Sequence, residues 1–573
     1  YRREKRLYLC RMIPLKRHVY ILAAAAALIA AAVYISCLYP AFAGNDSPET
    51  ISASVNLWLE HAPGYPLHAM LGKIASLIPA GGNAFRINLL SVFLSSITAF
   101  LFVLIAGKSG GRGAAAVFCG SMVLVFSSTF WGQGIEAKGS IYILNILLML
   151  IIVSCLDEVP GRKKILLLAF AFGLAVSNSY MSAAAFIPAV IYACIKNRKD
   201  MAPAALLFIL GLTPYIYIFI RGQAQLPPRW TDASALSGFL FLVLRHGYPG
   251  LPGFNISEAF FQAAMALKGL YENFSFVIIF ALPGAFYALG KKPRTFAALI
   301  SCAVMNLILA VFFNSVPESA PWFIAIYLMP AYLITAVFIT CGFVWAADIL
   351  KGKKTALLIA AVPLALFLSN LSKNDASRDF LDYDLGENLI KTTGKGALYL
   401  SYGDYFGMPM HYMCFAAREK SAVQNCDISS LAYSFGIYDL YKLTGVKLQN
   451  NGEFKGAMEK ISYGRDVFTN LYTGAAADYY IDPARWRPCG ILMKYGEKEG
   501  RGDFLFGLYS YRGIFDGRSQ LRDFELPVIS IYPSAMARIY SFTKSGFERK
   551  KLLRHAGAFP GVDLKKYGFE KTP

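Results

Sequence analysis

The sequence VYILAAAAALIAAAVYISCLYPAFAGNDSPET, residues 19–50, contains the pattern that decides the fold. The apolar run 19–39 is long enough to cross a bilayer as a helix, and the polar segment 44–50 follows it at once. Its two carboxylates, Asp46 and Glu49, are therefore expected at a boundary between membrane and water. Ionisable groups in such a place indicate a functional site.

The alternation of apolar run and polar loop continues to residue 370 and predicts eleven membrane-spanning helices. The runs are 19–39, 86–107, 113–130, 140–156, 163–179, 181–195, 202–220, 274–290, 295–314, 323–349 and 354–370. The fifth and sixth runs are short, so one helical hairpin that does not fully cross is an alternative for them. The stretch 65–79 is brief and contains two prolines, which favours an interfacial helix.

The distribution of basic residues predicts the orientation of these helices. Of the 573 residues 56% are hydrophobic and 16% are charged, with a net charge of +20. The basic residues cluster in the N-terminal tail and after every second run, which places those segments in the cytoplasm. The clusters are Arg2, Arg3, Lys5, Arg6, Arg11, Lys16 and Arg17; Lys108 and Arg112; Arg162, Lys163 and Lys164; Lys196, Arg198 and Lys199; Lys291, Lys292 and Arg294; and Lys351, Lys353 and Lys354. Cytoplasmic loops thus explain the charge, and no nucleic-acid partner is expected.

An odd number of crossings places the remainder of the chain outside the cytoplasm. We predict a transmembrane domain over 1–370, with outer loops 40–85, 131–139 and 221–273, and an extracytoplasmic α/β or α+β domain over 371–573. The segment 396–402 is typical of a strand, and 428–444 is typical of a helix. The expected localisation is a cell membrane, the inner membrane where there are two.

Asp46 and Glu49 allow two interpretations. If a helix begins at Pro48, residues three apart share a face, and the two carboxylates can act together on a substrate. Alternatively Asp46 or Ser47 caps the helix, Pro48 occupies its first position, and Glu49 interacts favourably with the helix dipole. A catalytic carboxylate can also lie at a helix start, so both interpretations stay open.

Other candidate residues are expected on the same side of the membrane. His61 and Tyr65 belong to a turn fixed by two prolines, which is suited to be the wall of a pocket or simply a turn at the membrane surface. Arg86 begins the second run, where it is either an interfacial anchor or a phosphate ligand. Aromatic rings can stack on a sugar while cations hold a phosphate. The remaining candidates for substrate binding are Glu136, Lys138, Trp230, Asp232, Arg245, His246 and Tyr248.

Three segments in the first outer loop carry a family resemblance. DSPE at 46–49, HAPGYPL at 61–67 and FRINL at 85–89 resemble the DSGE, HPPGYPL and FRVNL segments of the protein O-mannosyltransferase-like family, which are polytopic proteins of the glycosyltransferase C (GT-C) superfamily. Looser matches follow in order: WGQ at 131–133, YILN at 142–145, RWTD at 229–232, RHGY at 245–248, LSYGD at 400–404 and PCGILMK at 488–494.

The resemblance implies a GT-C-like fold and an inverting transfer of a mannose-like sugar from a polyprenyl-phosphate donor to a protein or glycan hydroxyl at the outer face. By matched position Asp46 is the base, and Arg86, Lys138 and Arg245 are available for the leaving phosphate. Two departures stand out. Pro48 replaces the usual Gly. Lys138 stands near the place of a usual Glu, and the acidic role of that Glu has either moved to Glu136 or been lost.

Two other classes remain as alternatives. A transporter would carry charges or broken helices at the midplane of two related halves, which the sequence lacks. A non-catalytic member would bind the lipid-linked sugar without transferring it. Two carboxylates three apart can also bind Mg²⁺ or Mn²⁺, so a divalent metal is an open expectation.

Overall fold

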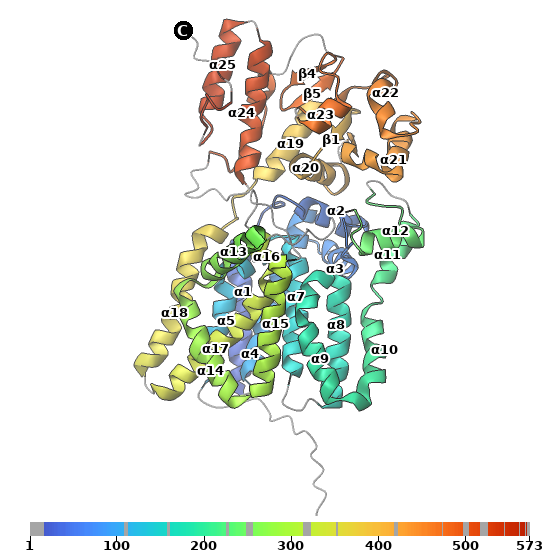
Figure 1. Cartoon of the computed structure of the whole chain (residues 1–573). Helices are drawn as coiled ribbons and strands as arrows, with labels where there is room; N and C mark the ends of the chain where they lie inside the picture. The colour runs from blue at the N-terminus through green and yellow to red at the C-terminus, as the bar shows by residue number, and fades with distance from the viewer. Residues whose placement is uncertain are drawn as a thin grey trace, which may run out of the picture.

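The computed structural model describes most of the chain and shows two stacked parts (Figure 1). The described residues are 17–107, 113–156, 161–224, 229–247, 256–312, 323–350, 353–417, 422–472, 474–496, 503–515, 525–543, 545–560, 562–567 and 569. A helical bundle contains the first two thirds of the chain, and a smaller part with a β-sheet lies over one end of it.

The helical bundle consists of apolar helices of different lengths. They are α1 (Arg17–Ser36), α4 (Asn83–Gly107), α5 (Ala114–Phe126), α7 (Gly139–Cys155), α8 (Arg162–Ala183), α9 (Ile187–Lys196), α10 (Met201–Gly211), α11 (Tyr215–Gly222), α14 (Ala281–Lys291), α15 (Pro293–Phe312), α17 (Met329–Ile349) and α18 (Lys353–Asn374). Within the described residues, 8 helical stretches are long and apolar enough to cross a membrane, and α5 and α7 are shorter apolar helices. The multi-pass membrane fold is confirmed, while the count of eleven crossings stays a prediction.

One of these stretches, α8 with α9, reverses its direction. Ser179 has non-helical backbone angles (φ −155°, ψ 96°) inside α8. Asp200, which follows α9, lies 3.4 Å from Arg162 at the start of α8, and a Cβ on Gly173 would come within 2.9 Å of Gly211 in α10. A straight helix from 162 to 196 cannot return to its own start, so the chain folds back at Ser179. The predicted division between 163–179 and 181–195 agrees with this turn.

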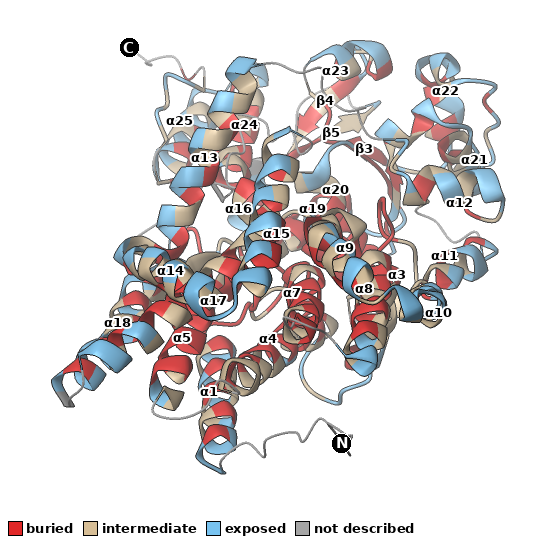
Figure 2. Ribbon diagram, turned by 60° about the horizontal axis from the view of Figure 1, so that its bottom comes forward, coloured by how far each residue is buried: buried red, intermediate tan, exposed pale blue. Residues whose placement is uncertain are grey.

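A second group of helices gathers at the end of the bundle beneath the sheet-containing part (Figure 1). They are α2 (Ser47–Asn56), α3 (Pro66–Ser76), α6 (Ser128–Gln133), α12 (Leu236–Val243), α13 (Ile256–Phe274) and α16 (Phe323–Tyr327). The outer surface of the bundle is rich in exposed residues (Figure 2), including large apolar ones such as Leu28, Leu206 and Leu357. A lipid-facing surface explains such exposure, because in a bilayer apolar side chains need no burial in protein.

The smaller part is an α/β domain. Its sheet has the order β2-β1-β3-β5-β4, with β1 parallel to β2 and β3, and β5 antiparallel to β3 and β4. The strands are β1 (Leu398–Ser401), β2 (Gln424–Asp427), β3 (Val467–Thr469), β4 (Trp486–Cys489) and β5 (Leu492–Tyr495). The helices are α19 (Leu381–Thr393), α20 (Asp404–Phe415), α21 (Ser434–Thr444), α22 (Phe454–Ile461), α23 (Ala475–Tyr480), α24 (Glu525–Phe542) and α25 (Gly546–Gly557). The strand expected within 396–402 is β1, and the segment 428–444 forms a short 3-10 helix followed by α21.

Helix α20 joins the two parts by packing on α2. The Asn56 side chain donates a hydrogen bond to the Phe415 carbonyl (3.1 Å), and Asn83 donates to the Ala416 carbonyl (2.8 Å). The rings of Trp58 and Phe415 meet edge to face, 4.6 Å apart. The charge of Asp46 also acts on Asp404 at the start of α20, so the other end of this helix lies near the loop that carries Asp46.

Candidate functional site

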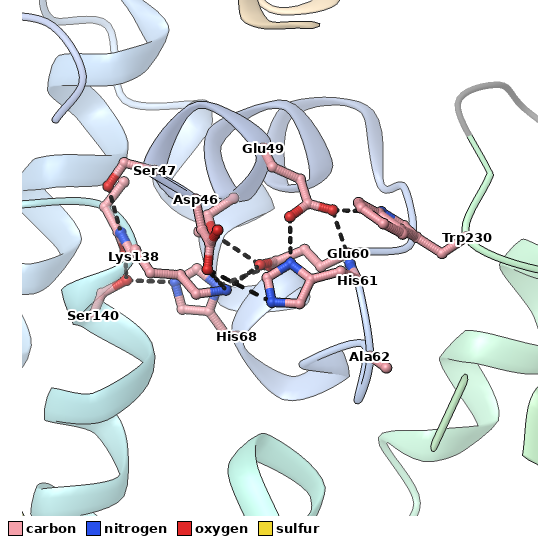
Figure 3. Close-up of polar contacts among 12 residues, drawn as sticks. Asp46, Ser47, Glu49, Glu60, His61, Ala62, His68, Lys138, Ser140 and Trp230 are labelled. Carbon is pink, nitrogen blue, oxygen red and sulfur yellow. Dashed lines mark hydrogen bonds and ion pairs between the residues drawn. The ribbon is translucent and has the colours of Figure 1, made fainter. Parts of the chain in front are cut away.

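Asp46 lies immediately before α2, and its side chain makes no capping hydrogen bond. Pro48 is in the first turn, as the sequence predicted. The Asp46 carboxylate instead lies 3.6 Å from His61 Nε2 and 3.6 Å from Lys138 Nζ (Figure 3). About a third of this side chain is exposed (32%). The carboxylate is thus held by charged neighbours while it stays accessible.

Glu49 has a different surrounding from Asp46, because donors surround it. It accepts hydrogen bonds from the backbone N–H of His61 (2.8 Å), from His61 Nδ1 (2.5 Å) and from Trp230 Nε1 (2.6 Å). Its side chain is nearly buried. Glu49 therefore orients His61, whose other nitrogen faces Asp46, as Figure 3 shows. The two carboxylates thus contact opposite nitrogens of one imidazole ring.

Lys138 is the central cation of the site. Its ammonium group lies 3.6 Å from Asp46 and 3.5 Å from Glu60, and 4.2 Å from the centre of the Tyr65 ring. The side chain is only 8% exposed. Lys138 thus provides positive charge between two carboxylates, and the departure seen in the sequence has a defined place in the structure.

Glu60 and His68 are site residues that the sequence analysis missed. Glu60 is fully buried, accepts a hydrogen bond from Thr50 (2.8 Å) and lies 3.6 Å from His68 Nδ1. His68 Nε2 contacts the hydroxyl of Ser140 in α7 at 2.5 Å. The available signal was the adjacency of Glu60 to His61, together with a second histidine one residue beyond the quoted segment 61–67.

Glu136 is connected to the start of α2 through Ser47. The Ser47 hydroxyl donates to Glu136 (3.1 Å) and accepts from the backbone N–H of Lys138 (3.2 Å), and Gln133 donates to Glu136 at 2.8 Å. Glu136 is therefore a structural neighbour of Asp46 and Lys138 in the second outer loop.

The surroundings set the protonation of these groups. Burial alone would raise the pKa of Asp46, but His61 and Lys138 outweigh it and lower the value. Burial and Lys138 act to lower the pKa of His61, yet Glu49 and Asp46 raise it overall. Burial raises the pKa of Glu136 to about 7. At neutral pH Asp46 is thus a carboxylate beside the Lys138 ammonium group, and its charge favours the protonated form of His61.

The turn between His61 and α3 has the tight geometry that its sequence predicted. Gly64 has φ +91° and Tyr65 has φ +40°, both in the left-handed region. The Tyr65 ring meets the His61 ring edge to face, 5.7 Å between centroids. Burial raises the pKa of Tyr65 to about 12, so its hydroxyl stays protonated beside Lys138.

The two candidate arginines have different surroundings. Arg245, with φ +59°, donates to the Ala62 carbonyl (3.4 Å) and is close enough to Asp46 to help lower its pKa. Arg86 donates to the carbonyls of Ser76, Ala80 and Gly81 at 2.9–3.1 Å. These bonds tie Arg86 to the connection between α3 and α4 rather than to Asp46.

The other candidates of the third outer segment also differ in whether they contact the site. Trp230 reaches the site through Glu49, as described above. Asp232 is exposed and accepts from the N–H and hydroxyl of Ser234 (3.3 and 2.5 Å), which is a local turn contact. His246 is exposed and lies edge-on to Phe241. Tyr248 lies outside the described residues.

Asp404 approaches the site from the α/β domain. It begins α20, directly after Gly403, whose φ is +78°. Burial raises the pKa of Asp404 to about 6, with a further contribution from the charge of Asp46. The sequence had indicated this Gly-Asp turn only through the family resemblance, because Asp46 lies more than 300 residues before Asp404 in the chain.

No group of three or more His, Cys, Asp or Glu side chains in the described part of the chain is arranged to hold a metal ion. The positive charge between Asp46 and Glu60 comes from Lys138. The expectation of a divalent metal stays untested.

Comparison with known proteins confirms the resemblance. Residues 46–202 match the family model described as "Protein O-mannosyl-transferase TMEM260 N-terminal domain". Protein O-mannosyl-transferase TMEM260 of Mus musculus is 26% identical over 71% of this chain and 62% of its own length. The tmem260 protein of Dictyostelium discoideum is 21% identical over 74% of this chain and 58% of its own length. The chain thus spans about six tenths of the length of these relatives.

The fold also resembles solved structures. The crystal structure of ArnT from Cupriavidus metallidurans bound to undecaprenyl phosphate has a TM-score of 0.54 at 11% identity, with coverage of 81% of this chain and 95% of that one. The apo state gives a TM-score of 0.52 at 12% identity, over 80% and 94% of the two chains. At such low identity the likeness concerns the fold, and it confirms the expected GT-C-like architecture.

Proposed function

We propose that this protein is an inverting glycosyltransferase that moves a mannose-like sugar from a polyprenyl-phosphate donor to an acceptor hydroxyl at the outer face of the membrane. The observation that carries the proposal is Asp46: an accessible carboxylate, kept ionised by His61 and Lys138, at the end of a membrane bundle. The names of the TMEM260 relatives support mannose and a protein acceptor, and the ArnT complex supports a polyprenyl phosphate.

In this proposal Asp46 is the general base. The acceptor oxygen attacks the anomeric carbon while Asp46 takes the hydroxyl proton. The bond between that carbon and the phosphate oxygen breaks, and the polyprenyl phosphate leaves with the electron pair. One displacement inverts the configuration at the anomeric carbon. Glu49 orients His61, and His61 in turn holds Asp46 in place for this step.

Lys138 and Arg245 have the charge that the leaving group needs. A phosphate gains negative charge as the glycosidic bond breaks, and fixed cations stabilise such charge best where water is scarce. Lys138 is nearly buried, and Arg245 acts on Asp46 electrostatically from the third outer segment. The donor phosphate would therefore bind on the side of Asp46 that faces these two residues.

The protein is proposed to lie in the cell (inner) membrane. Its N-terminus is then in the cytoplasm, and its α/β domain is outside the cytoplasm. The domain division proposed from the sequence, 1–370 and 371–573, falls inside α18, whose last residue is Asn374. In this orientation an acceptor outside the cytoplasm reaches the site from the side of the α/β domain.

Asp46→Asn tests the proposal, because it keeps the shape and removes the base. We expect transfer of mannose from a mannosyl phosphopolyprenol to fall on the order of 10²–10⁴-fold, with donor binding retained. Asp478→Asn, an exposed carboxylate of α23, is the matched control and should leave the rate unchanged. Wild-type protein that binds the donor lipid without transferring its sugar would favour a non-catalytic binder, and sugar movement across vesicles would favour a transporter.

A further inference from the structure

Two adjacent residues, Arg229 and Trp230, contact different parts of the molecule. Arg229 contacts Asp439 in α21 of the α/β domain, with its Nη2 and Nε atoms 2.7 and 2.9 Å from one carboxylate oxygen. Trp230 contacts Glu49 in α2, with its indole N–H 2.6 Å from the carboxylate. The peptide that joins these residues thus links the α/β domain to the candidate site.

The contact of Arg229 with α21 is firm. The Arg229 and Asp439 side chains are only 8% and 13% exposed, and Nη2 also donates to the Phe435 carbonyl (3.2 Å). Separating a buried ion pair leaves an uncompensated charge, which is strongly unfavourable. The same outer segment has a second contact with this domain, between the rings of Phe241 and Tyr433, 5.9 Å apart.

The contact of Trp230 with Glu49 is equally specific. The oxygen that accepts from the indole also accepts from the backbone N–H of His61, and the other oxygen accepts from His61 Nδ1. The Trp230 ring also lies edge-on to the His61 ring at 5.9 Å. A change in the position of Trp230 therefore changes how Glu49 holds His61.

The connection between the two contacts is short, because the two residues are adjacent in the chain. Consecutive Cα atoms are about 3.8 Å apart across a trans peptide, and this distance is fixed. Once α21 moves relative to α2 by more than rotation of the Arg229 and Trp230 side chains can absorb, either the Arg229–Asp439 pair or the Trp230–Glu49 bond breaks, or the residues at the other contact move as well.

We infer that Arg229, Trp230 and Asp439 form a strap through which the position of the α/β domain sets the orientation of Glu49 and His61. The three are positioning residues, since they act on the reacting atoms through Glu49. This inference rests on the proposed function for its catalytic consequences, but the structural coupling itself does not depend on any activity.

The catalytic test is a double-mutant cycle with Asp439→Asn and Trp230→Phe. Each variant should lower kcat about tenfold while the KM for a mannosyl phosphopolyprenol changes less than twofold. Because both act through Glu49, the double variant should be about as impaired as one single variant. Each should also move the alkaline limb of the pH profile of kcat to lower pH, because a displaced Glu49 no longer raises the pKa of His61. Independent, additive losses or an unmoved pH profile would overturn the inference.

Arg229→Lys adds a conservative variant in case Asp439→Asn does not fold. Lysine keeps the charge but cannot contact the carboxylate and the Phe435 carbonyl with a planar fork. We expect an intermediate kcat and an intermediate pH shift. Full activity of this variant, with its unchanged pH profile, would contradict the strap.

Hydrogen exchange gives a readout without activity. In Asp439→Asn the amides of 47–64 should exchange at least tenfold faster, while those of β1 and β3 keep their rates. Glu459→Gln, which removes a surface ion pair with Arg485 inside the α/β domain, is the matched control and should leave 47–64 unchanged. Unchanged exchange over 47–64 in Asp439→Asn would refute the coupling, even if Asp46→Asn has established the transferase activity. Accelerated exchange in Asp439→Asn, together with a wild-type protein that transfers no sugar, would support the coupling and reject the proposed function.

Discussion

The ammonium group of Lys138 lies 3.6 Å from the carboxylate of Asp46, at a position where the sequence departs from the family segments that it resembles. Burial alone would raise the pKa of Asp46, but the charges of His61 and then Lys138 lower it overall. A base with a low pKa is a weaker proton acceptor, but it stays ionised and ready in moderately acidic surroundings. The departure therefore changes the pH range of the proposed site rather than removing its base.

Lys138→Met should move the acidic limb of the pH profile. Without the ammonium charge, the pKa of Asp46 rises, so that protonation of the base begins at higher pH. We expect the acidic limb of kcat/KM to shift upward by about one pH unit. Lys138→Arg keeps the charge and should shift the limb less. Steady-state transfer measured across pH 4–8 gives the answer, and coincident limbs for Met and wild type would mean that Lys138 does not control Asp46.

Arg245→Gln and Arg86→Gln should have different effects on donor binding. Arg245 lies near Asp46, whereas Arg86 is bonded to three carbonyls between α3 and α4. We expect Arg245→Gln to weaken binding of polyprenyl phosphate about tenfold, in line with a lost charge-assisted hydrogen bond. Arg86→Gln should lower Tm and leave this affinity unchanged. Equal losses of affinity in both variants would return Arg86 to the phosphate site.

Glu60→Gln should destabilise the outer end of the bundle. Although burial alone would raise it, Lys138, His68 and Thr50 lower the pKa of Glu60, so its ionised form stabilises the fold at neutral pH. That contribution is lost as pH falls below the ordinary range for Glu, about 4.3. Removing the charge leaves Lys138 with one buried partner fewer and should cost about 3 kcal/mol. Thermal unfolding in detergent at pH 7 tests this; a Tm within 1 °C of wild type would contradict it, with ~3 kcal/mol expected to move Tm by several degrees.

Cysteine labelling tests the orientation. Lys395→Cys, exposed in the turn before β1, should react with a membrane-impermeant maleimide in cells whose outer barrier is opened. Lys199→Cys, exposed between α9 and α10, should react only after lysis. Both variants are made in a background without the native cysteines. The reverse pattern would place Asp46 in the cytoplasm and remove the basis of the proposed reaction.

The sequence predicted the helical bundle well because each apolar run is a local signal. Even the turn at Ser179 falls at the border between two predicted runs. The start of the predicted run 323–349 was less accurate: the structure divides it into α16 and α17, because Leu328 interrupts the regular helix before Pro330.

The site was predicted only in part, because its contacts join distant segments. Asp46, Glu49 and His61 were recognisable from one loop. Glu60 was not, because its contact is with Lys138, which is 78 residues away in the chain. Arg86 and Arg245 looked equivalent in the sequence. Only the folded chain shows that free carbonyls at 76–81 take up the guanidinium of Arg86.

The turn at Ser179 also bears on biogenesis. Asn145 of α7 donates to the Ser179 carbonyl (2.8 Å), and Asn178 donates to the Ile141 carbonyl and to Asn145 (both 2.8 Å). A bilayer offers no water to a carbonyl freed by a broken helix, so the Asn145 amide takes the place of water at the Ser179 carbonyl, and Asn178 holds Asn145 in position. Since α7 precedes the hairpin in the chain, it leaves the ribosome first. The Asn145 side chain and the Ile141 carbonyl are therefore synthesised before the turn that bonds to them. The order of synthesis thus matches the order in which the turn needs them, and the hairpin can enter the bilayer as one unit onto a prepared surface.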